Sequence, residues 1–169
     1  MEQNTLHILH LTMQILFYGY ILFIILKYGV QTSISESYYK LPTNLQWIFT
    51  LVTWGYAACA IIIGLDTTGS EWVFVSGVGI LFVGASPAFH TKDNKRTLEN
   101  EVHIIGAGVG IIGLFLFLTM VLNLWYITIA FVILSSLTYI WKPTRVNSLW
   151  WIELYAFLSL DISYITILF

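Results

Sequence analysis

The sequence predicts an all-α polytopic membrane protein with six transmembrane helices and with both termini outside. Three observations support this fold class: the composition, six long apolar runs and the placement of the basic residues. Of the 169 residues, 58% are hydrophobic and only 9% are charged, whereas a soluble domain carries roughly 25% charged residues. A soluble fold of this size has too little interior for so much apolar surface, so lipid must cover part of it. The net charge of −2 is too small to indicate a nucleic-acid partner.

Six apolar runs are long enough to be spans, since a helix needs about 20 apolar residues to cross a bilayer. The predicted spans, all within a single domain over residues 1–169, are Leu6–Leu26, Leu45–Gly64, Trp72–Phe89, His103–Leu122, Leu124–Trp141 and Ser148–Leu168. The first run does not read as a cleaved signal peptide, because its flank is acidic and no small-residue cleavage site follows. Pro87 is expected to end or kink the third span.

The basic residues set the predicted orientation. All seven fall in the first, third and fifth gaps between spans: Lys27, Lys40, Lys92, Lys95, Arg96, Lys142 and Arg145. Alternate gaps of a six-span chain lie on the same side, and an excess of Lys and Arg marks the cytoplasmic side. We therefore expect a cell-membrane protein with its odd-numbered loops in the cytoplasm. The fourth gap, at Asn123, is barely a turn.

Glycines concentrate in the third and fourth predicted spans. Gly106-x-x-x-Gly110 forms a smooth face that lets two helix backbones approach closely. Gly108-x-Gly110-x-x-Gly113 also matches the dinucleotide fingerprint by letters, but that fingerprint requires a preceding strand. Helix packing is therefore our interpretation. The glycine-rich spans would also suit a second copy of the chain or a partner membrane subunit.

Two acids lie inside the last predicted span. Glu153 and Asp161 are eight residues apart, hence about 12 Å along a helix and near one side of it. A carboxylate within a span normally faces the bundle interior or a water-filled cavity. We predict that this face points inward, with Asp161 deeper than Glu153. Two interpretations stay open: functional acids, or acids that only hold helices together.

A metal site is a second hypothesis. His90 ends the third predicted span and His103 starts the fourth, so a short loop joins them. Together with Glu101 and Glu153, which lie at a similar depth, they would form a ligand set for zinc or another divalent cation. The alternative is that both histidines are interfacial residues bonded to headgroups, water or loop carbonyls.

On the opposite face, His7 and His10 are one turn apart at the start of the first span. We interpret them, with Asp66 and Glu71 of the second gap, as ordinary interfacial residues. The alternative is an outer cation site that includes Asp161.

The segment Ser33-Ile34-Ser35-Glu36-Ser37-Tyr38-Tyr39 resembles one in small multi-pass bacterial membrane proteins, which carry Ser-Ile-Ser-x-x-Tyr-Tyr just after the first span. The likeness continues through a glycine-rich third span ending near Pro87, a His that opens the fourth span, and Trp151-x-Glu153 in the last. It covers most of the chain, but only the first segment is specific. The resemblance implies six spans in a bacterial inner membrane and no particular activity. It directs attention to Ser35, Tyr38, Tyr39, His103 and Glu153.

A second resemblance is to alkaline ceramidases and related seven-span metal hydrolases. Ser86-x-x-x-His90 followed by Glu101 looks like the start of their zinc-binding pattern. The chain departs from that pattern, because it has six predicted spans, a Glu in place of the Asp, and no histidine in its last span. His103 and Glu153 would have to replace the missing ligands.

Three functional classes follow, in order of preference. The first is binding or translocation of a small solute, ion, proton or lipid through a polar cavity open to the cytoplasm, with Glu153, Asp161, Ser35 and Tyr39 as the candidate site. The second is a metal-dependent lipid hydrolase, in which a bound cation activates water and Glu101 or Glu153 is the general base. The third is a non-catalytic accessory subunit of the membrane.

Overall fold

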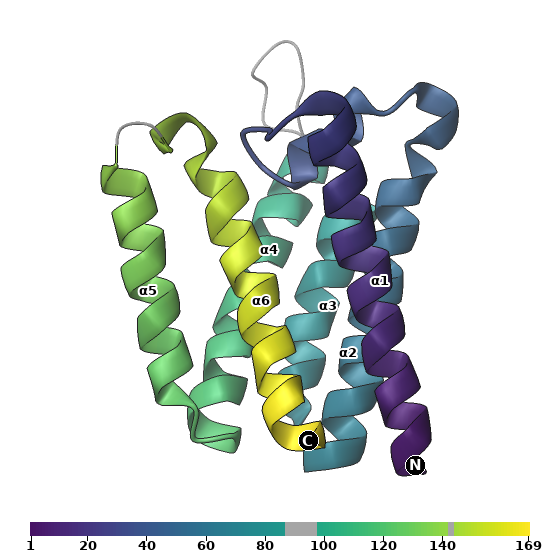
Figure 1. Cartoon of the computed structure of the whole chain (residues 1–169), viewed down its shortest axis with the longest axis vertical. Coiled ribbons are helices and arrows are strands. Elements are labelled where there is room, and N and C mark those ends of the chain that lie inside the picture. Colours follow the sequence, from purple (N-terminus) through teal and green to yellow (C-terminus); the bar gives the residue numbers. More distant parts are fainter. Residues whose placement is uncertain (87–97, 142–143) are drawn as a thin grey trace.

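The computed structural model describes residues 1–86, 98–141 and 144–169, and these residues form an all-helical bundle without strands. The predicted all-α fold is therefore confirmed. Its long helices run side by side along one axis (Figure 1). They are α1 (Gln3–Tyr28), α2 (Trp47–Thr68), α3 (Glu71–Ala85), α4 (Leu98–Leu116), α5 (Trp125–Ile140) and α6 (Ser148–Leu168). Short 3-10 helices η1 (Ser35–Lys40), η2 (Thr43–Leu45) and η4 (Arg145–Asn147) lie in the connections, and the π-helical η3 (Phe117–Val121) extends α4.

Within the described residues, four helical segments are long and apolar enough to span a membrane: Gln3–Tyr28, Thr43–Thr68, Leu98–Val121 and Arg145–Leu168. The other two helices are apolar but shorter, with 15 residues in α3 and 16 in α5. At 1.5 Å per residue these two are roughly 22–24 Å long, against a hydrocarbon core of about 30 Å. Many large apolar side chains point outward, among them Ile8, Trp47 and Ile140, as lipid-facing residues do.

The described basic side chains all lie at one end of the bundle. Both termini lie at one end, together with the α2–α3 and α4–α5 connections, and the α1–α2 connection and the start of α6 lie at the other (Figure 1). Lys27, Lys40 and Arg145 belong to the end without termini. The remaining basic residues, with Pro87 and His90, fall outside the described residues. At the end with the termini, Asn123 turns the chain from η3 into α5 with a positive φ of 56°.

The predicted glycine packing is confirmed between α3 and α4. A Cβ placed on Gly79 would lie 2.3 Å from the backbone nitrogen of Gly110 and 2.5 Å from the carbonyl oxygen of Gly106. Gly113 packs as closely, since its Cβ would lie 2.6 Å from the nitrogen of Ser76. These glycines already pack against the facing helix of the same chain, whereas Gly108 has open space around it. The glycines of α4 that pack here therefore contact α3 of the same chain, and a second copy or partner subunit stays a prediction.

Helix α6 joins two parts of the bundle. On one side it packs against α5, and on the other it meets α1, α2 and α4 at fewer points. Trp150 at its start and Tyr164 near its end are both fully buried. The limited contact between α6 and the closely packed α2–α3–α4 group leaves room for an internal cavity.

Candidate functional site

The segment after α1 folds back into the bundle instead of forming a solvated loop. Ser33, Ile34, Ser35 and Ser37 are all at least 95% buried. The serine hydroxyls bond to nearby main chain, as this residue type does in turns: Ser33 Oγ accepts from the N–H of Glu36 at 3.0 Å, and Ser37 Oγ donates to the carbonyl of Ile34 at 2.5 Å. The Ser-Ile-Ser motif is therefore a structural element that closes one end of the bundle.

This segment also holds the start of α6. The carbonyl of Thr32 accepts a hydrogen bond from the N–H of Trp150 at 3.0 Å, which satisfies one of the free donors of the first helical turn. The hydroxyls of Tyr20 on α1 and Ser37 on η1 are 2.6 Å apart. The first connection is thus tied to both α1 and α6.

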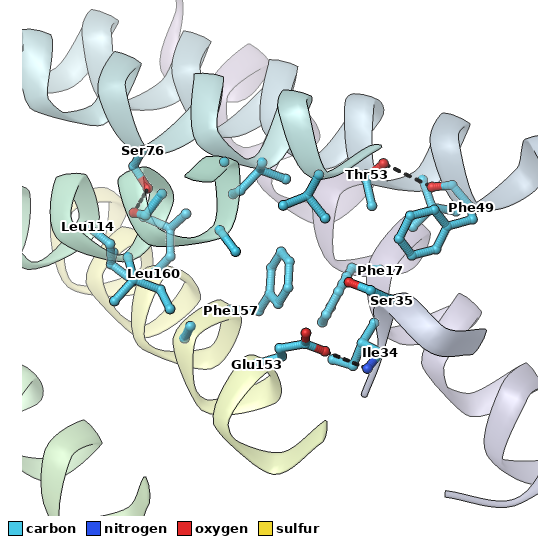
Figure 2. A pocket seen from close by; sticks show the side chains of 18 of the residues that line it. Phe17, Ile34, Ser35, Phe49, Thr53, Ser76, Leu114, Glu153, Phe157 and Leu160 are labelled. Carbon is cyan, nitrogen blue, oxygen red and sulfur yellow. Dashed lines mark hydrogen bonds between the residues drawn. The ribbon is translucent and has the colours of Figure 1, made fainter. Parts of the chain in front are cut away.

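Glu153 is bound by the folded segment. Its Oε2 accepts a hydrogen bond from the N–H of Ile34 at 2.5 Å. Hydrogen bonds to an ionised acceptor are stronger than neutral ones, so this main-chain donor favours a charged Glu153. Figure 2 shows the carboxylate beside Ile34 and Ser35. The predicted inward direction of Glu153 is confirmed.

Glu153 borders a cavity of about 90 Å³ that is lined by residues of α1, η1, α2, α3, α4 and α6 (Figure 2). Most of its lining is apolar. The hydroxyl of Thr53 donates to the carbonyl of Phe49 and that of Ser76 to the carbonyl of Gly110, each at 3.0 Å. Among the described lining residues, Glu153 is the only acid. The lining residues are Phe17, Tyr20, Ile34, Ser35, Phe49, Val52, Thr53, Ser76, Ile80, Val83, Gly106, Ala107, Gly110, Ile111, Leu114, Glu153, Ala156, Phe157 and Leu160.

Three aromatic rings lie between Glu153 and Asp161. We call Phe17, Tyr56 and Phe157 the aromatic layer: the centroids of Phe17 and Phe157 are 4.0 Å apart, those of Tyr56 and Phe157 are 4.9 Å apart, and those of Phe17 and Tyr56 are 5.2 Å apart. Phe157 is four residues from either acid on α6, so all three share one helix face. Phe157 lines the cavity and Asp161 does not.

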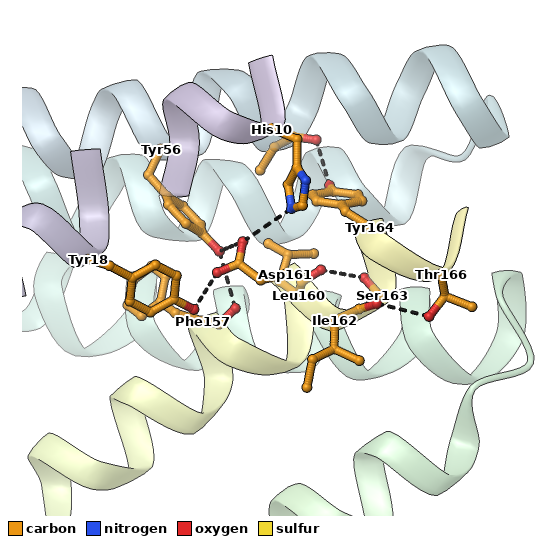
Figure 3. Close-up of polar contacts among 11 residues, drawn as sticks. His10, Tyr18, Tyr56, Phe157, Leu160, Asp161, Ile162, Ser163, Tyr164 and Thr166 are labelled. Carbon is orange, nitrogen blue, oxygen red and sulfur yellow. Dashed lines mark hydrogen bonds and ion pairs between the residues drawn. The ribbon is translucent and has the colours of Figure 1, made fainter. Parts of the chain in front are cut away.

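Asp161 forms a second polar cluster, beyond the aromatic layer (Figure 3). The hydroxyl of Tyr18 donates to its Oδ2, and the hydroxyl of Tyr56 lies 3.4 Å from its Oδ1 and 3.2 Å from the carbonyl of Phe157. His10 Nε2 is 3.9 Å from Oδ1. Asp161 is 2% exposed and His10 is 4% exposed. The predicted inward direction of Asp161 is confirmed. His10, which we interpreted as an interfacial residue, has its ring buried beside Asp161 and Tyr164 of α6.

Asp66 of the second gap and His7 of α1 lie near the end of the bundle that holds the termini. Asp66 pairs with the amino group of Met1 at 2.8 Å, and both groups are partly exposed. His7 packs edge-to-face against Phe169, with ring centroids 4.4 Å apart. An outer cation site would therefore have to form without Asp66.

The residues predicted to bind metal are only partly described. His103 is buried, with Nδ1 3.0 Å from the carbonyl of Ser86, whereas Glu101 is exposed on another side of α4. His90 lies outside the described residues. Within the described part of the chain, no three His, Cys, Asp or Glu side chains lie close enough together to hold a metal ion. The zinc site stays a prediction that depends on His90.

Tyr39 lies on η1, four residues after Ser35, with its ring edge-to-face against Tyr38 at 5.2 Å. It is not among the residues that line the cavity. Sequence reasoning missed Tyr18 and Tyr56, although a signal was present. A tyrosine in the middle of an apolar span needs a hydrogen-bond acceptor for its hydroxyl, and Asp161 was the obvious mid-span acceptor.

No protein-family model, curated protein or solved structure matches this chain. Its function is therefore inferred from the cavity, from Glu153 and from the cluster around Asp161.

Proposed function

We propose that this chain is a six-span protein of a cell membrane that binds a small, largely apolar molecule in the cavity beside Glu153. In this proposal the α1–α2 and α5–α6 connections face the cytoplasm. The observation that carries the proposal is a single carboxylate at the edge of an otherwise apolar intramembrane cavity.

The orientation is supported by the charge distribution along the bundle. Lys27, Lys40 and Arg145 share one end, and an excess of basic residues marks the cytoplasmic side. The shorter α3 and α5 lie alongside the four longer helices (Figure 1), which favours six crossings over four. A topology reporter fused after Phe169 should read as external; a cytoplasmic signal would overturn the orientation.

The size of the cavity and the residues that line it indicate which kind of ligand would fit. A volume of about 90 Å³ holds several water molecules or a short hydrocarbon segment. Apolar walls favour the hydrocarbon, since isolated waters would find few polar partners there. Glu153 can accept a hydrogen bond from an amine or a hydroxyl and would repel an acid. We therefore propose a lipid-like amine or alcohol as the ligand.

Binding is favoured over translocation by the aromatic layer. Phe17, Tyr56 and Phe157 are packed against one another between the cavity and the Asp161 cluster. A solute in the cavity would have to displace these rings to continue along α6. The cavity thus has the form of a binding pocket that ends at the aromatic layer.

The test is photolabelling in liposomes with a long-chain amine that carries a diazirine. Wild type should be labelled at cavity residues, and Ala156→Phe, which fills the cavity, should lose this labelling. Ala58→Phe is the matched control, because Ala58 faces outward on α2. Glu153→Gln should reduce labelling by the amine more than labelling by a fatty alcohol of equal length. Equal labelling of wild type and Ala156→Phe would overturn the proposal.

A further inference from the structure

Asp161 is an acid in the interior of the bundle without a permanent cation beside it. It is 2% exposed, and among the described residues no lysine or arginine pairs with it. Lys27, Lys40 and Arg145 all belong to the opposite end. A buried carboxylate in such surroundings is costly unless it is paired, hydrogen-bonded or protonated. The side chains around Asp161 therefore decide which form it takes.

Two hydroxyls support the ionised form. Tyr18 on α1 and Tyr56 on α2 each direct a hydroxyl at a different oxygen of the carboxylate. A hydroxyl carries one donor and two acceptor lone pairs. The same tyrosines can thus donate to a carboxylate or accept from a carboxylic acid. The cluster can satisfy Asp161 in both protonation states.

His10 is the independent observation. Its ring is 96% buried, and Nε2 has no hydrogen-bond partner, although it points at Asp161 Oδ1 from 3.9 Å (Figure 3). Buried polar atoms are normally hydrogen-bonded. A movement of about 1 Å would bring the two atoms to hydrogen-bond distance, and one proton between them would satisfy both. The orphaned nitrogen therefore marks the place where a proton fits.

The charge balance favours uptake of one proton. With a neutral His10 and an ionised Asp161, the cluster carries one negative charge. One added proton, on Nε2 or on the carboxylate, makes the cluster neutral overall, which an interior of low dielectric constant favours. The titratable groups that α1, α2 and α6 bury in this half of the bundle are His10, Tyr56, Cys59, Asp161 and Tyr164, and Tyr18 and His7 are partly buried. The hydroxyl of Tyr164 does not donate to Asp161, because it donates to the carbonyl of Ala60 at 2.6 Å.

His7 offers a path for this proton from the end of the bundle that holds the termini. It lies one turn before His10 on α1, beside Phe169, and is only partly buried. The aromatic layer lies on the other side of Asp161, between the cluster and the cavity. We infer that His10 and Asp161, with Tyr18 and Tyr56, form a proton-binding site that exchanges with the end of the bundle holding the termini and is separate from the Glu153 cavity.

Infrared spectroscopy tests this site directly. The chain contains three aspartates, Asp66, Asp93 and Asp161. In an Asp66→Asn/Asp93→Asn background with 13C-labelled aspartate, only Asp161 carries the label. In liposomes, the labelled carboxylic-acid C=O band should gain and lose intensity reversibly with pH. His10→Gln should move the midpoint of that change by about one pH unit, because the proton is no longer shared.

The controls separate this inference from the proposed ligand. Glu153→Gln should leave the Asp161 band and its midpoint unchanged, because the aromatic layer lies between the two acids. The spectra are recorded without ligand, so failure of the photolabelling would not alter them. A band that is constant over the whole pH range in which the protein stays folded would overturn the inference. So would an unchanged midpoint in His10→Gln. Both measurements keep Asp161 in place, so neither depends on whether Asp161→Asn folds.

Discussion

Glu153 and Asp161 share one face of α6, two turns apart, but the chain surrounds them differently. Glu153 accepts a hydrogen bond from the main-chain N–H of Ile34, and it borders a cavity. Asp161 accepts from the hydroxyls of Tyr18 and Tyr56 and does not line that cavity. Main-chain amides can only donate, so they favour the ionised form of an acid. Hydroxyls can also accept, so they allow an acid to change its protonation state.

The largest difference should come from truncating each acid. Asp161→Ala removes the acceptor of the Tyr18 hydroxyl and one of the two acceptors of the Tyr56 hydroxyl, which should cost about 2–3 kcal/mol of unfolding free energy. Glu153→Ala should cost less, about 1–2 kcal/mol, because water can enter from the adjacent cavity and bond the freed N–H of Ile34. Denaturant unfolding in detergent micelles, followed by circular dichroism, measures both. A larger loss for Glu153→Ala would reverse the comparison.

Gly79→Ala should affect the cavity beside Glu153 but not the cluster around Asp161. The added Cβ would lie 2.3 Å from the backbone nitrogen of Gly110, so α3 and α4 must separate, at a cost of about 2 kcal/mol. Because both helices line the cavity, photolabelling should fall while the infrared band of Asp161 stays unchanged. Gly108→Ala is the matched control, since nothing lies within 4 Å of its added Cβ. Equal stability of the two variants would contradict the packing described.

Glu153→Gln should release the folded segment without unfolding the bundle. The amide retains only one acceptor oxygen, so the hydrogen bond from the N–H of Ile34 weakens and the variant loses about 1.5 kcal/mol. Hydrogen exchange at the Ile34 amide should accelerate in this variant. Asp161→Asn should leave exchange at Ile34 unchanged, and acceleration in both variants would indicate that the two acids are coupled.

The smallest effects should come from the two tyrosines. Tyr18→Phe keeps the ring and removes one hydroxyl donor, which should cost about 1 kcal/mol. Tyr56→Phe should cost less, because its hydroxyl is divided between Asp161 at 3.4 Å and the carbonyl of Phe157 at 3.2 Å. Thermal unfolding of the two variants under one condition ranks them. A larger loss of stability in Tyr56→Phe would indicate that Tyr56, and not Tyr18, is the stronger donor to Asp161.

Much of the fold could be predicted from local properties of the chain. Apolar runs located the helices, because hydropathy is a property of each segment by itself. The glycines of α4 indicated a close helix contact, and the structure shows that the glycine-rich α3 makes this contact through Gly79. The inward face of Glu153 and Asp161 followed from helical periodicity and the cost of exposing an acid to lipid.

The partners of these acids could not be predicted in the same way. Glu153 bonds to the main chain of Ile34 from 119 residues away, and Asp161 to Tyr18 from 143 residues away. Such pairs depend on the rotation and depth of whole helices, which packing determines. His10 shows the same limit, because its position near the start of α1 indicated an interface, whereas neighbouring helices bury it.

The sequence by itself determined where the helices lie, which end of the bundle carries Lys27, Lys40 and Arg145, and which face of α6 turns inward. These features depend on composition and on periodicity within one segment. Only the tertiary structure decided that the Ser-Ile-Ser segment binds Glu153, that an aromatic layer closes the cavity, and that His10 points at Asp161 without a partner. The reason is physical: each of these contacts joins different elements of the chain, and its geometry exists only when those elements are packed together.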